Sequence, residues 1–258
     1  MITVISPAKT LDLETKVESE IKSYPKFNAE PERLIKKLKT LSRKKISNLM
    51  SLSEKLSDLN YQRYQMWSPE PSEEMVKQAV LMFKGDVYQG LEAETFTDEE
   101  YHKAQENLRI LSGLYGYLKP MDLIQAYRLE MGTKLPVARK KNLYEFWGDK
   151  IAKEINNELE GHKQKYLINL ASNEYFKAAN ERKIKYPIIT PVFKDAKNGN
   201  YKVISFFAKR ARGVMARWII QNKIEEPEKL KLFDQDGYYY NDLLSSDKEI
   251  VFTREEMQ

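Results

Sequence analysis

The sequence predicts a mixed α/β fold, with residues 1–258 forming one compact domain in which helices flank a mixed sheet. Strand-like apolar runs alternate with amphipathic helix signals, which is typical of a sheet covered by helices. In addition, Asn198-Gly199 separates the apolar runs 188–193 and 201–206. This dipeptide is a strong signal of a tight antiparallel hairpin. We therefore expect parallel and antiparallel strands in the same sheet.

The N-terminal part is expected to contain one strand followed by a helical lobe. Met1–Ile5 is an apolar, strand-like opening that ends in a polar turn carrying a lysine. Pro31–Arg43 places its leucines and Ile35 on one helical face, as an amphipathic helix does. Ser42 is a good cap for a second helix, whose apolar face we expect to reach Leu56. The segment 31–78 is therefore predicted to form a helical lobe against the sheet.

The middle of the chain alternates between short apolar runs and turns. Ala79–Phe83 fits a buried strand and the end of a helix equally well, because so short a run has no decisive period. Thr97 and Glu100 form a capping box, which begins a helix that runs to about Asn107. The apolar run 108–111 then predicts a strand that enters a glycine-spaced turn.

The C-terminal half repeats this alternation. We expect a helix marked by Phe146 and Leu159, a strand at 166–171, and a helix after it that Ser172 caps. A long helix is predicted at Phe207–Gln221, and the tail 238–252 is expected to add an edge strand. The residues at helical spacing that should face the core in the long helix are Phe207, Ala211, Val214 and Trp218.

Composition excludes several classes of protein. The chain has no cysteine, so it has no disulfides and no thiolate metal sites. Its apolar runs are far too short to span a bilayer, and its N-terminus lacks a signal-peptide pattern. These features favour the cytosol. A net charge of +5, from 43 basic and 38 acidic residues, permits a polyanionic partner without requiring one.

Basic residues recur where predicted strands end. Lys9, Lys84 and Lys119 each follow a strand-like run and its turn, and Lys177 lies one turn into the helix capped by Ser172. Repeated cations at strand exits predict a site that holds phosphate or another anion. The long helix adds a second group of cations on the flanks of its apolar face, where guanidinium forks can meet phosphates. An ordinary solvated helix face explains this second group equally well.

Sequence patterns of nucleotide hydrolysis and metal catalysis are missing. The chain contains neither GxxxxGK[ST] nor GxGxxG. Its only histidines are His102 and His162, and Glu99-x-x-His102 is one half of a di-iron motif whose other half is lacking. The carboxylates available for acid–base chemistry also have an ordinary turn-capping interpretation, and Asp86, beside Lys84, is the best placed. This set is Asp12, Asp86, Asp122, Glu130 and Asp149.

Seven segments resemble the YaaA family of bacterial peroxide-stress proteins, in order and from end to end of the chain. They are ISPAKTLD (5–12), FKGDVYQGLEAETF (83–96), LSGLYGYLKPMDLIQAYRLEMG (111–132), LYEFWGD (143–149), INLASNEYFK (168–177), PVFKDAKNGNYKVISFFAKRARGVMARWII (191–220) and GYYY (237–240).

The resemblance implies a cytoplasmic protein that protects cells against hydrogen peroxide by limiting free intracellular iron. It also implies an unusual mixed α/β fold, DNA binding in a positively charged cleft, and a helix-hairpin-helix-like element, which we expect near 101–125. Gly113 and Gly116 depart from that element's pattern, because they are three residues apart rather than two. No credible iron ligands are present in the sequence, so we expect an indirect route to iron, with no metal and no cofactor.

Three functions follow from these observations, and we favour a binding protein over an enzyme. In the first, the cleft binds duplex or distorted DNA through its phosphates without reading sequence. In the second, an enzyme acts on a nucleotide, a nucleic acid or a small anionic substrate with Lys9, Lys84 and Asp86 in the site. In the third, the basic face docks a protein partner in iron handling. The oligomeric state stays open. The candidate DNA- or anion-binding residues are Lys9, Lys84, Lys119, Arg128, Lys177, Lys209, Arg210, Arg212 and Arg217.

Overall fold

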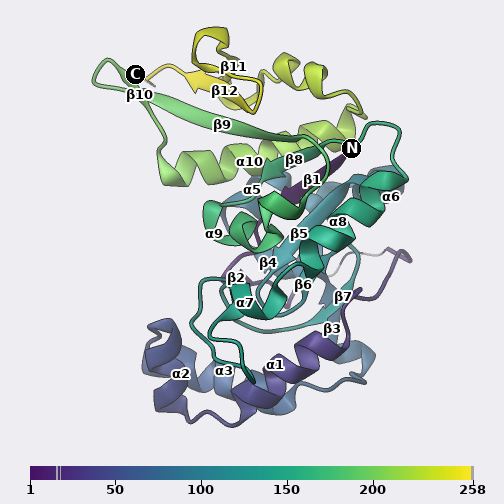
Figure 1. The fold of residues 1–258 in the computed structure, drawn as a ribbon, viewed down its shortest axis with the longest axis vertical. Helices are drawn as coiled ribbons and strands as arrows, with labels where there is room; N and C mark the ends of the chain where they lie inside the picture. The colour runs from purple at the N-terminus through teal and green to yellow at the C-terminus, as the bar shows by residue number, and fades with distance from the viewer. Residues whose placement is uncertain (16, 18, 257–258) are drawn as a thin grey trace.

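A mixed sheet runs along the length of the molecule, with helices on both of its faces (Figure 1). The structure, a computed structural model, describes residues 1–15, 17 and 19–256. Within these residues the main sheet has eight strands in the order β11-β12-β9-β8-β1-β5-β6, and β10 pairs with β9. The strands are β1 (Ile2–Ile5), β5 (Leu108–Ser112), β6 (Gly116–Leu118), β8 (Leu167–Leu170), β9 (Ile188–Lys197), β10 (Asn200–Lys202), β11 (Tyr239–Tyr240) and β12 (Glu249–Arg254).

The centre of this sheet is parallel and its margins are antiparallel. β1 pairs in parallel with both β5 and β8, and β8–β9 and β9–β12 are parallel as well. β6, β10 and β11 each run antiparallel to their neighbour. β1 and β8 are buried along their whole length. Such continuous burial is expected of parallel strands with helices on both sides. The predicted mixed α/β fold is confirmed.

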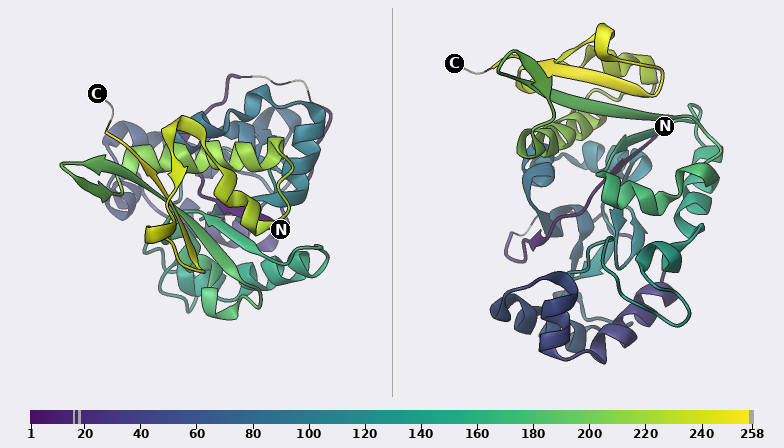
Figure 2. Two further views of the ribbon diagram at one scale, coloured as in Figure 1. Left: turned by 90° about the horizontal axis from the view of Figure 1, so that it is seen from above. Right: turned by 60° about the vertical axis from the view of Figure 1, so that its left-hand side comes forward.

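Two groups of helices cover the sheet. α5, α6 and α10 lie on one face, whereas α7, α8 and α9 lie on the other (Figures 1 and 2). Three more helices form a lobe at one end of the long axis, as predicted for 31–78. The helices are α1 (Ala29–Lys39), α2 (Arg43–Met50), α3 (Glu54–Met66), α4 (Ala79–Met82), α5 (Asp86–Leu91), α6 (Asp98–Asn107), α7 (Leu143–Trp147), α8 (Lys150–Glu160), α9 (Asn173–Phe176) and α10 (Ser205–Gln221).

Short elements join these layers. β2 (Thr10–Leu11) pairs antiparallel with β4 (Phe83–Lys84), and β3 (Val76–Gln78) pairs antiparallel with β7 (Leu123–Gln125). The second ladder attaches the helical lobe to the body of the molecule. The 3-10 helices are η1 (Glu73–Met75), η2 (Ala93–Thr95), η3 (Lys177–Ala179), η4 (Glu181–Lys183), η5 (Pro227–Leu232), η6 (Gln235–Gly237) and η7 (Asp242–Leu244).

Several local expectations are confirmed. Asn198 and Gly199 form the hairpin turn between β9 and β10, with φ of +53° and +71°, the positive angles that a tight primed turn requires. The capping box of α6 is present at Thr97 and Glu100. The tail adds strands at one margin of the sheet, where β11 is the edge and β12 lies inside it.

Other expectations are wrong. The segment 101–125 is not a helix-hairpin-helix element, because α6 is followed by the antiparallel strands β5 and β6. Gly116, at φ +71°, reverses the chain directly into β6, and Trp147 packs against it. The helix predicted to reach Leu56 is two helices, because Ser51 takes a left-handed conformation and Ser53 caps α3. Ala79–Phe83 is a short helix that ends in a strand.

The closest helix contact in the described chain joins α5 and α10 through two glycines. A Cβ atom on Gly213 would lie 1.8 Å from the carbonyl oxygen of Val87, and one on Gly90 would lie 2.3 Å from that of Arg210. The two backbones therefore touch where any side chain would separate them. α10 is buried on more of its circumference than predicted, because the sheet covers it on one side and α5 on the other. The fully buried residues are Ala208, Ala211, Gly213, Met215, Ala216, Ile219 and Ile220, whereas Phe207, Val214 and Trp218 are only partly buried.

We expect Gly213→Ala to destabilise the fold, because the added methyl group meets backbone that cannot move aside. Overpacking of this kind lowers the free energy of unfolding by about 1–3 kcal/mol, which urea denaturation measures. Gly161→Ala is the control, since a Cβ there meets its nearest atom at an ordinary 3.6 Å and the backbone is right-handed. Equal stability of the two variants would show that α5 and α10 can separate at little cost.

Candidate anion-binding site

The sheet has a topological switch point between β1 and β8. From β1 the chain proceeds to β5 on one side, then returns to β8 on the other side of β1 and continues to β9 and β12. Helices that follow neighbouring strands on opposite sides leave a crevice at the carboxyl ends of those strands. Ligands of open α/β sheets bind in this crevice. The loop 6–10 after β1 and Ser172 after β8 lie there.

The two strand exits are joined by hydrogen bonds. The backbone amide of Ser172 donates to the Ser6 hydroxyl at 2.9 Å, and the two hydroxyls lie 3.3 Å apart. The Tyr88 hydroxyl donates to the carbonyl oxygen of Ser6 at 3.1 Å, which fixes the start of α5 against the same loop. Burial raises the pKa of Tyr88 well above its ordinary value, so this hydroxyl stays a donor at neutral pH.

Strand pairing brings the first two predicted cations together. In the β2–β4 ladder Thr10 pairs with Lys84, so the chain before α5 lies beside the loop that carries Lys9. A Cβ on Gly85 would lie 3.3 Å from that of Ala8, which shows how closely the two segments approach. Lys84 Nζ is 3.2 Å from a carboxylate oxygen of Asp12, a residue that a turn just after β2 holds.

The glycine contact between α5 and α10 supplies the rest of the site. It places Lys209 and Arg212 of α10 opposite Asp86 at the start of α5, with Lys209 Nζ 4.0 Å from a carboxylate oxygen of Asp86. Arg212 is largely buried, and burial lowers the pKa of its guanidinium. Among the residues that the structure describes, Arg212 forms neither an ion pair nor a hydrogen bond. Its fork of donors is therefore free for a ligand.

These side chains line a hollow of about 340 Å³, which we call the switch-point hollow. Its volume falls within the range of small-ligand sites, about 300–1,000 Å³. Five of the residues singled out from the sequence converge here. The lining residues used below are Lys9, Lys84, Asp86, Lys209 and Arg212, together with Ser172, Glu174, Tyr88 and Tyr175.

The lysines of the hollow are held only weakly. Lys9, Lys84 and Lys209 have exposed side chains, and each faces one oxygen of a single carboxylate. Exposed ion pairs of this kind contribute about 0–1 kcal/mol. All three ammonium groups can therefore turn from their partners towards a bound anion at little cost.

The other predicted cations are placed elsewhere. Arg128 lies next to the hollow and pairs with Glu130, whose carboxylate also faces Lys9 at 3.4 Å. Lys177 lies over the ring of Tyr144. Arg210 pairs with Asp236 at 3.3 Å, and Arg217 donates to the carbonyl oxygens of Leu91 and Glu92 and to the Thr95 hydroxyl. Lys119 lies at the opposite end of the sheet.

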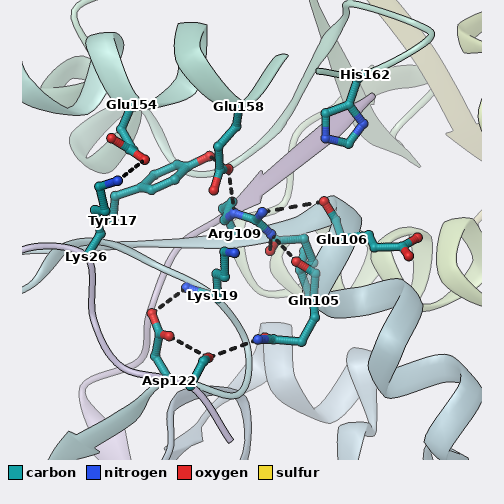
Figure 3. Close-up of polar contacts among 12 residues, drawn as sticks. Lys26, Gln105, Glu106, Arg109, Tyr117, Lys119, Asp122, Glu154, Glu158 and His162 are labelled. Carbon is teal, nitrogen blue, oxygen red and sulfur yellow. Dashed lines mark hydrogen bonds and ion pairs between the residues drawn. The ribbon is translucent and has the colours of Figure 1, made fainter. Parts of the chain in front are cut away.

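That opposite end carries a larger hollow, of about 600 Å³, at the amino ends of β1, β5 and β8. Figure 3 shows several of its polar residues together with polar neighbours outside the hollow. Arg109 is buried and donates to Glu158 at 2.7 Å and to the carbonyl oxygens of Gln105 and Leu108, while Tyr117 donates to the same glutamate. Because these partners occupy its guanidinium, Arg109 is a structural cation. We therefore place the candidate site at the switch point.

Most of the carboxylates considered for acid–base chemistry are already held by hydrogen bonds or ion pairs within the folded chain. Asp122 is buried and accepts hydrogen bonds from Ser23 and the backbone of Lys119 (Figure 3), and burial raises its pKa. Asp149 accepts from Asn180. Glu99 pairs with Lys223. Across residues 1–15, 17 and 19–256, no three histidine or acidic side chains come together to hold a metal ion.

Sequence reasoning missed part of the hollow. Ser172 was expected only to cap a helix, yet its side chain makes no capping bond to α9. Tyr88 and Tyr175 stand near basic residues in the sequence, which was a usable signal. Glu174 and Ser6 lie within segments that carry the family resemblance but were not singled out, because only the parallel pairing of β1 with β8 brings them to the site.

The fold and the hollow define a mixed α/β protein with a cation-lined, small-ligand-sized site at the switch point of its sheet. The chain belongs to the YaaA family: the model of that family, described as "Peroxide stress protein YaaA", matches residues 1–244. A UPF0246 protein of Aliivibrio fischeri (strain MJ11) is 52% identical over 256 residues, which is 99% of each chain. UPF0246 proteins of Cellvibrio japonicus and Colwellia psychrerythraea are also 52% identical over 256 residues, with 99% of this chain and 99% and 100% of theirs covered.

No helix within the described ranges combines the length and the apolar character that crossing a bilayer requires.

We expect Asp12→Asn to destabilise the protein in a pH-dependent way. The backbone amide and hydroxyl of Thr15, the amide of Glu14 and the Lys84 ammonium lower the pKa of Asp12 well below 3.8, against the opposing effect of burial. A lowered carboxyl pKa contributes stability above the ordinary value, and this contribution is lost as the pH falls through the folded value. Urea denaturation should show a loss of about 1–3 kcal/mol at pH 7 that shrinks below pH 4.

Asp247→Asn serves as the control for this experiment, because Asp247 is exposed in the turn before β12. Its effect should be small at every pH. A stability difference between the wild type and Asp12→Asn that stays constant down to pH 3 would contradict the assigned role of the carboxylate charge.

Proposed function

We propose that this protein acts in the peroxide stress response by binding DNA phosphates at the switch-point hollow without reading sequence. The observation that carries the proposal is the convergence of Lys9, Lys84, Lys209 and Arg212 from three separate segments on one concavity. Arginine and lysine contacts to phosphate give affinity and orientation but no base discrimination. The hollow is too small to enclose a duplex, so a duplex lies across its mouth and presents its phosphates to the cations.

The proposal also includes a cellular role in iron handling. The protein limits free intracellular iron in the cytoplasm and so protects DNA, and it does so through a route other than storage. Support comes from membership of a peroxide-stress family and from the basic hollow, since DNA is the molecule that iron and peroxide damage together. A protein partner in iron handling fits the same role, with the lysines as its docking surface.

We expect the double variant Lys209→Gln, Arg212→Gln to bind duplex DNA more weakly on every sequence. On duplex DNA the logarithm of affinity falls with the logarithm of salt concentration by about 0.9 per phosphate neutralised. The double variant should therefore lose up to about 2 units of slope. Filter binding across a salt series measures this slope.

The matched control is Lys229→Gln, Lys231→Gln on η5, which removes the same charge outside the hollow. Its affinity and slope should stay close to those of the wild type. If both double variants lose the same amount, the protein's overall charge binds DNA and the hollow does not.

A second candidate function is an enzyme on a nucleotide, a nucleic acid or a small anion. The observation that favours it is that Asp86 shares the hollow with Lys9 and Lys84, at a volume that suits one small ligand. Here Asp86 would act as the general base, within reach of a ligand held by the cations.

For this candidate we expect Asp86→Asn to abolish protection of cells from hydrogen peroxide while DNA affinity is retained. Removing a carboxylate from a basic hollow leaves phosphate binding intact or slightly stronger, so the two properties separate. The measurement is survival of cells whose own copy is replaced by the variant. Full protection by Asp86→Asn would rule out the general-base role.

A further inference from the structure

We infer that the switch-point hollow is built for a phosphate monoester, that is, a phosphate group at the end of a strand or on a free nucleotide. This inference rests on the proposed function, which gives the same hollow a phosphate ligand. It goes further by distinguishing a terminal phosphate from the diester phosphates within a strand.

The first argument is the charge inside the hollow. Its lining contains the cations Lys9, Lys84, Lys209 and Arg212 and the carboxylates Asp86 and Glu174, which leaves an excess of two positive charges. The rim carboxylates Glu130 and Asp12 do not cancel this excess, because each also pairs with a second cation outside the lining, Arg128 and Lys77 respectively. A phosphate monoester carries about −1.5 to −2 at neutral pH, because its second pKa is about 6. A diester within a strand carries only about −1. The excess charge of the hollow therefore matches the monoester.

The second argument is the arrangement of the donors. Arg212 presents a largely buried guanidinium that no carboxylate or carbonyl of the described chain occupies. Planar guanidinium forks hold phosphate oxygens in pairs. The Ser172 hydroxyl also lines the hollow and does not cap α9, although the residue stands at the cap position. It accepts a hydrogen bond from the Ser6 hydroxyl at 3.3 Å, which leaves its own proton free to donate to a ligand. A monoester offers three oxygens to such donors, whereas a diester offers two.

The third argument is the shape of the hollow. Apart from its charged groups, it is lined by Pro7, Val87, Leu170 and the rings of Tyr88 and Tyr175. A concavity of about 340 Å³ with this wall holds one charged head and part of an apolar or aromatic body. A terminal phosphate is joined to the rest of the ligand by one ester bond, so only one segment of the ligand has to leave the hollow. A diester is joined on both sides, so two segments of the same strand would have to bend into one small opening.

The test compares ends that differ only in the phosphate. A short duplex with 5′-phosphate ends and the same duplex with 5′-hydroxyl ends are bound to the protein, and AMP and adenosine are used as competitors. We expect the phosphorylated duplex to bind at least 10-fold more tightly than the hydroxyl form. AMP should displace it and adenosine should not. Because the second ionisation lies near pH 6, the preference should shrink between pH 7.5 and pH 5.

The competitors separate the two sources of a monoester. If AMP binds as tightly as the phosphorylated end, the ligand is a free nucleotide. If only the phosphorylated duplex binds tightly, the ligand is a strand end. Equal affinity for both duplexes, with no binding of AMP, would overturn the inference and leave the proposed DNA binding intact. Binding of AMP with no affinity for either duplex would overturn DNA binding and keep the monoester site.

Variants on α10 connect this preference to the hollow. Arg212→Met should lose the preference for the phosphorylated end by at least 10-fold, and its melting temperature should not fall, because it removes a buried charge that has no partner. Arg210→Met is the matched control: the same helix and the same change, but at a residue that faces Asp236 outside the hollow. An unchanged preference in a folded Arg212→Met protein would overturn the assignment.

Discussion

The contact between the backbones of α5 and α10 is the constraint on which the candidate site depends. Gly90 and Gly213 remove the side chains that would hold these helices apart, so each helix packs directly on a carbonyl of the other. α5 begins at Asp86, two residues after Lys84, and α10 carries Lys209 and Arg212 on the adjoining turns. With a normal helix separation of 8–10 Å, these groups would face each other across a wider and wetter gap. The same contact that packs the protein therefore sets the width of the hollow.

Arg212 differs from Arg109 and Arg254, two arginines whose guanidinium groups are mostly buried. Arg109 is satisfied by Glu158 and by backbone carbonyls. Arg254 lies between the rings of Phe207 and Tyr238 and donates to Asp195 at 2.8 Å. Both follow the rule that a buried charge is paired. Arg212 is partly buried and has no such partner among the described residues, so its charge is partly desolvated without an ion pair to compensate. Local destabilisation of this kind is common where a protein binds a ligand.

Much of the fold could be predicted from local sequence, whereas the site could be predicted only in part. Asn198-Gly199 and the capping box at Thr97 act within four residues, so their structures follow from the sequence alone. The segment after α6 was misassigned by family resemblance, although the apolar run 108–111 had already indicated a strand. Lys84 was identified because cations recur where predicted strands end, and Lys209 because cations flank the apolar face of the long helix. Their convergence, and the separation of Lys119 from them, depend on the order β8-β1-β5 in the sheet, and no local pattern encodes strand order.

The distribution of carboxylates, more than the number of cations, produces the basic site. The chain has only five more basic than acidic residues, and cations are spread over its whole length. At most places a carboxylate or a set of carbonyls lies beside each one, as for Arg210 with Asp236 and Arg217 with Glu92. At the switch point Lys9, Lys84 and Lys209 also face carboxylates, but the strand exits of β1 and β8 contribute serines and backbone, and α10 contributes Arg212, which pairs with no carboxylate of the described chain. A local excess of positive charge thus arises in a nearly balanced protein. Since such an excess acts over about a Debye length, roughly 8 Å at physiological salt, the proposed attraction of an anion is confined to this hollow and does not extend over the whole surface.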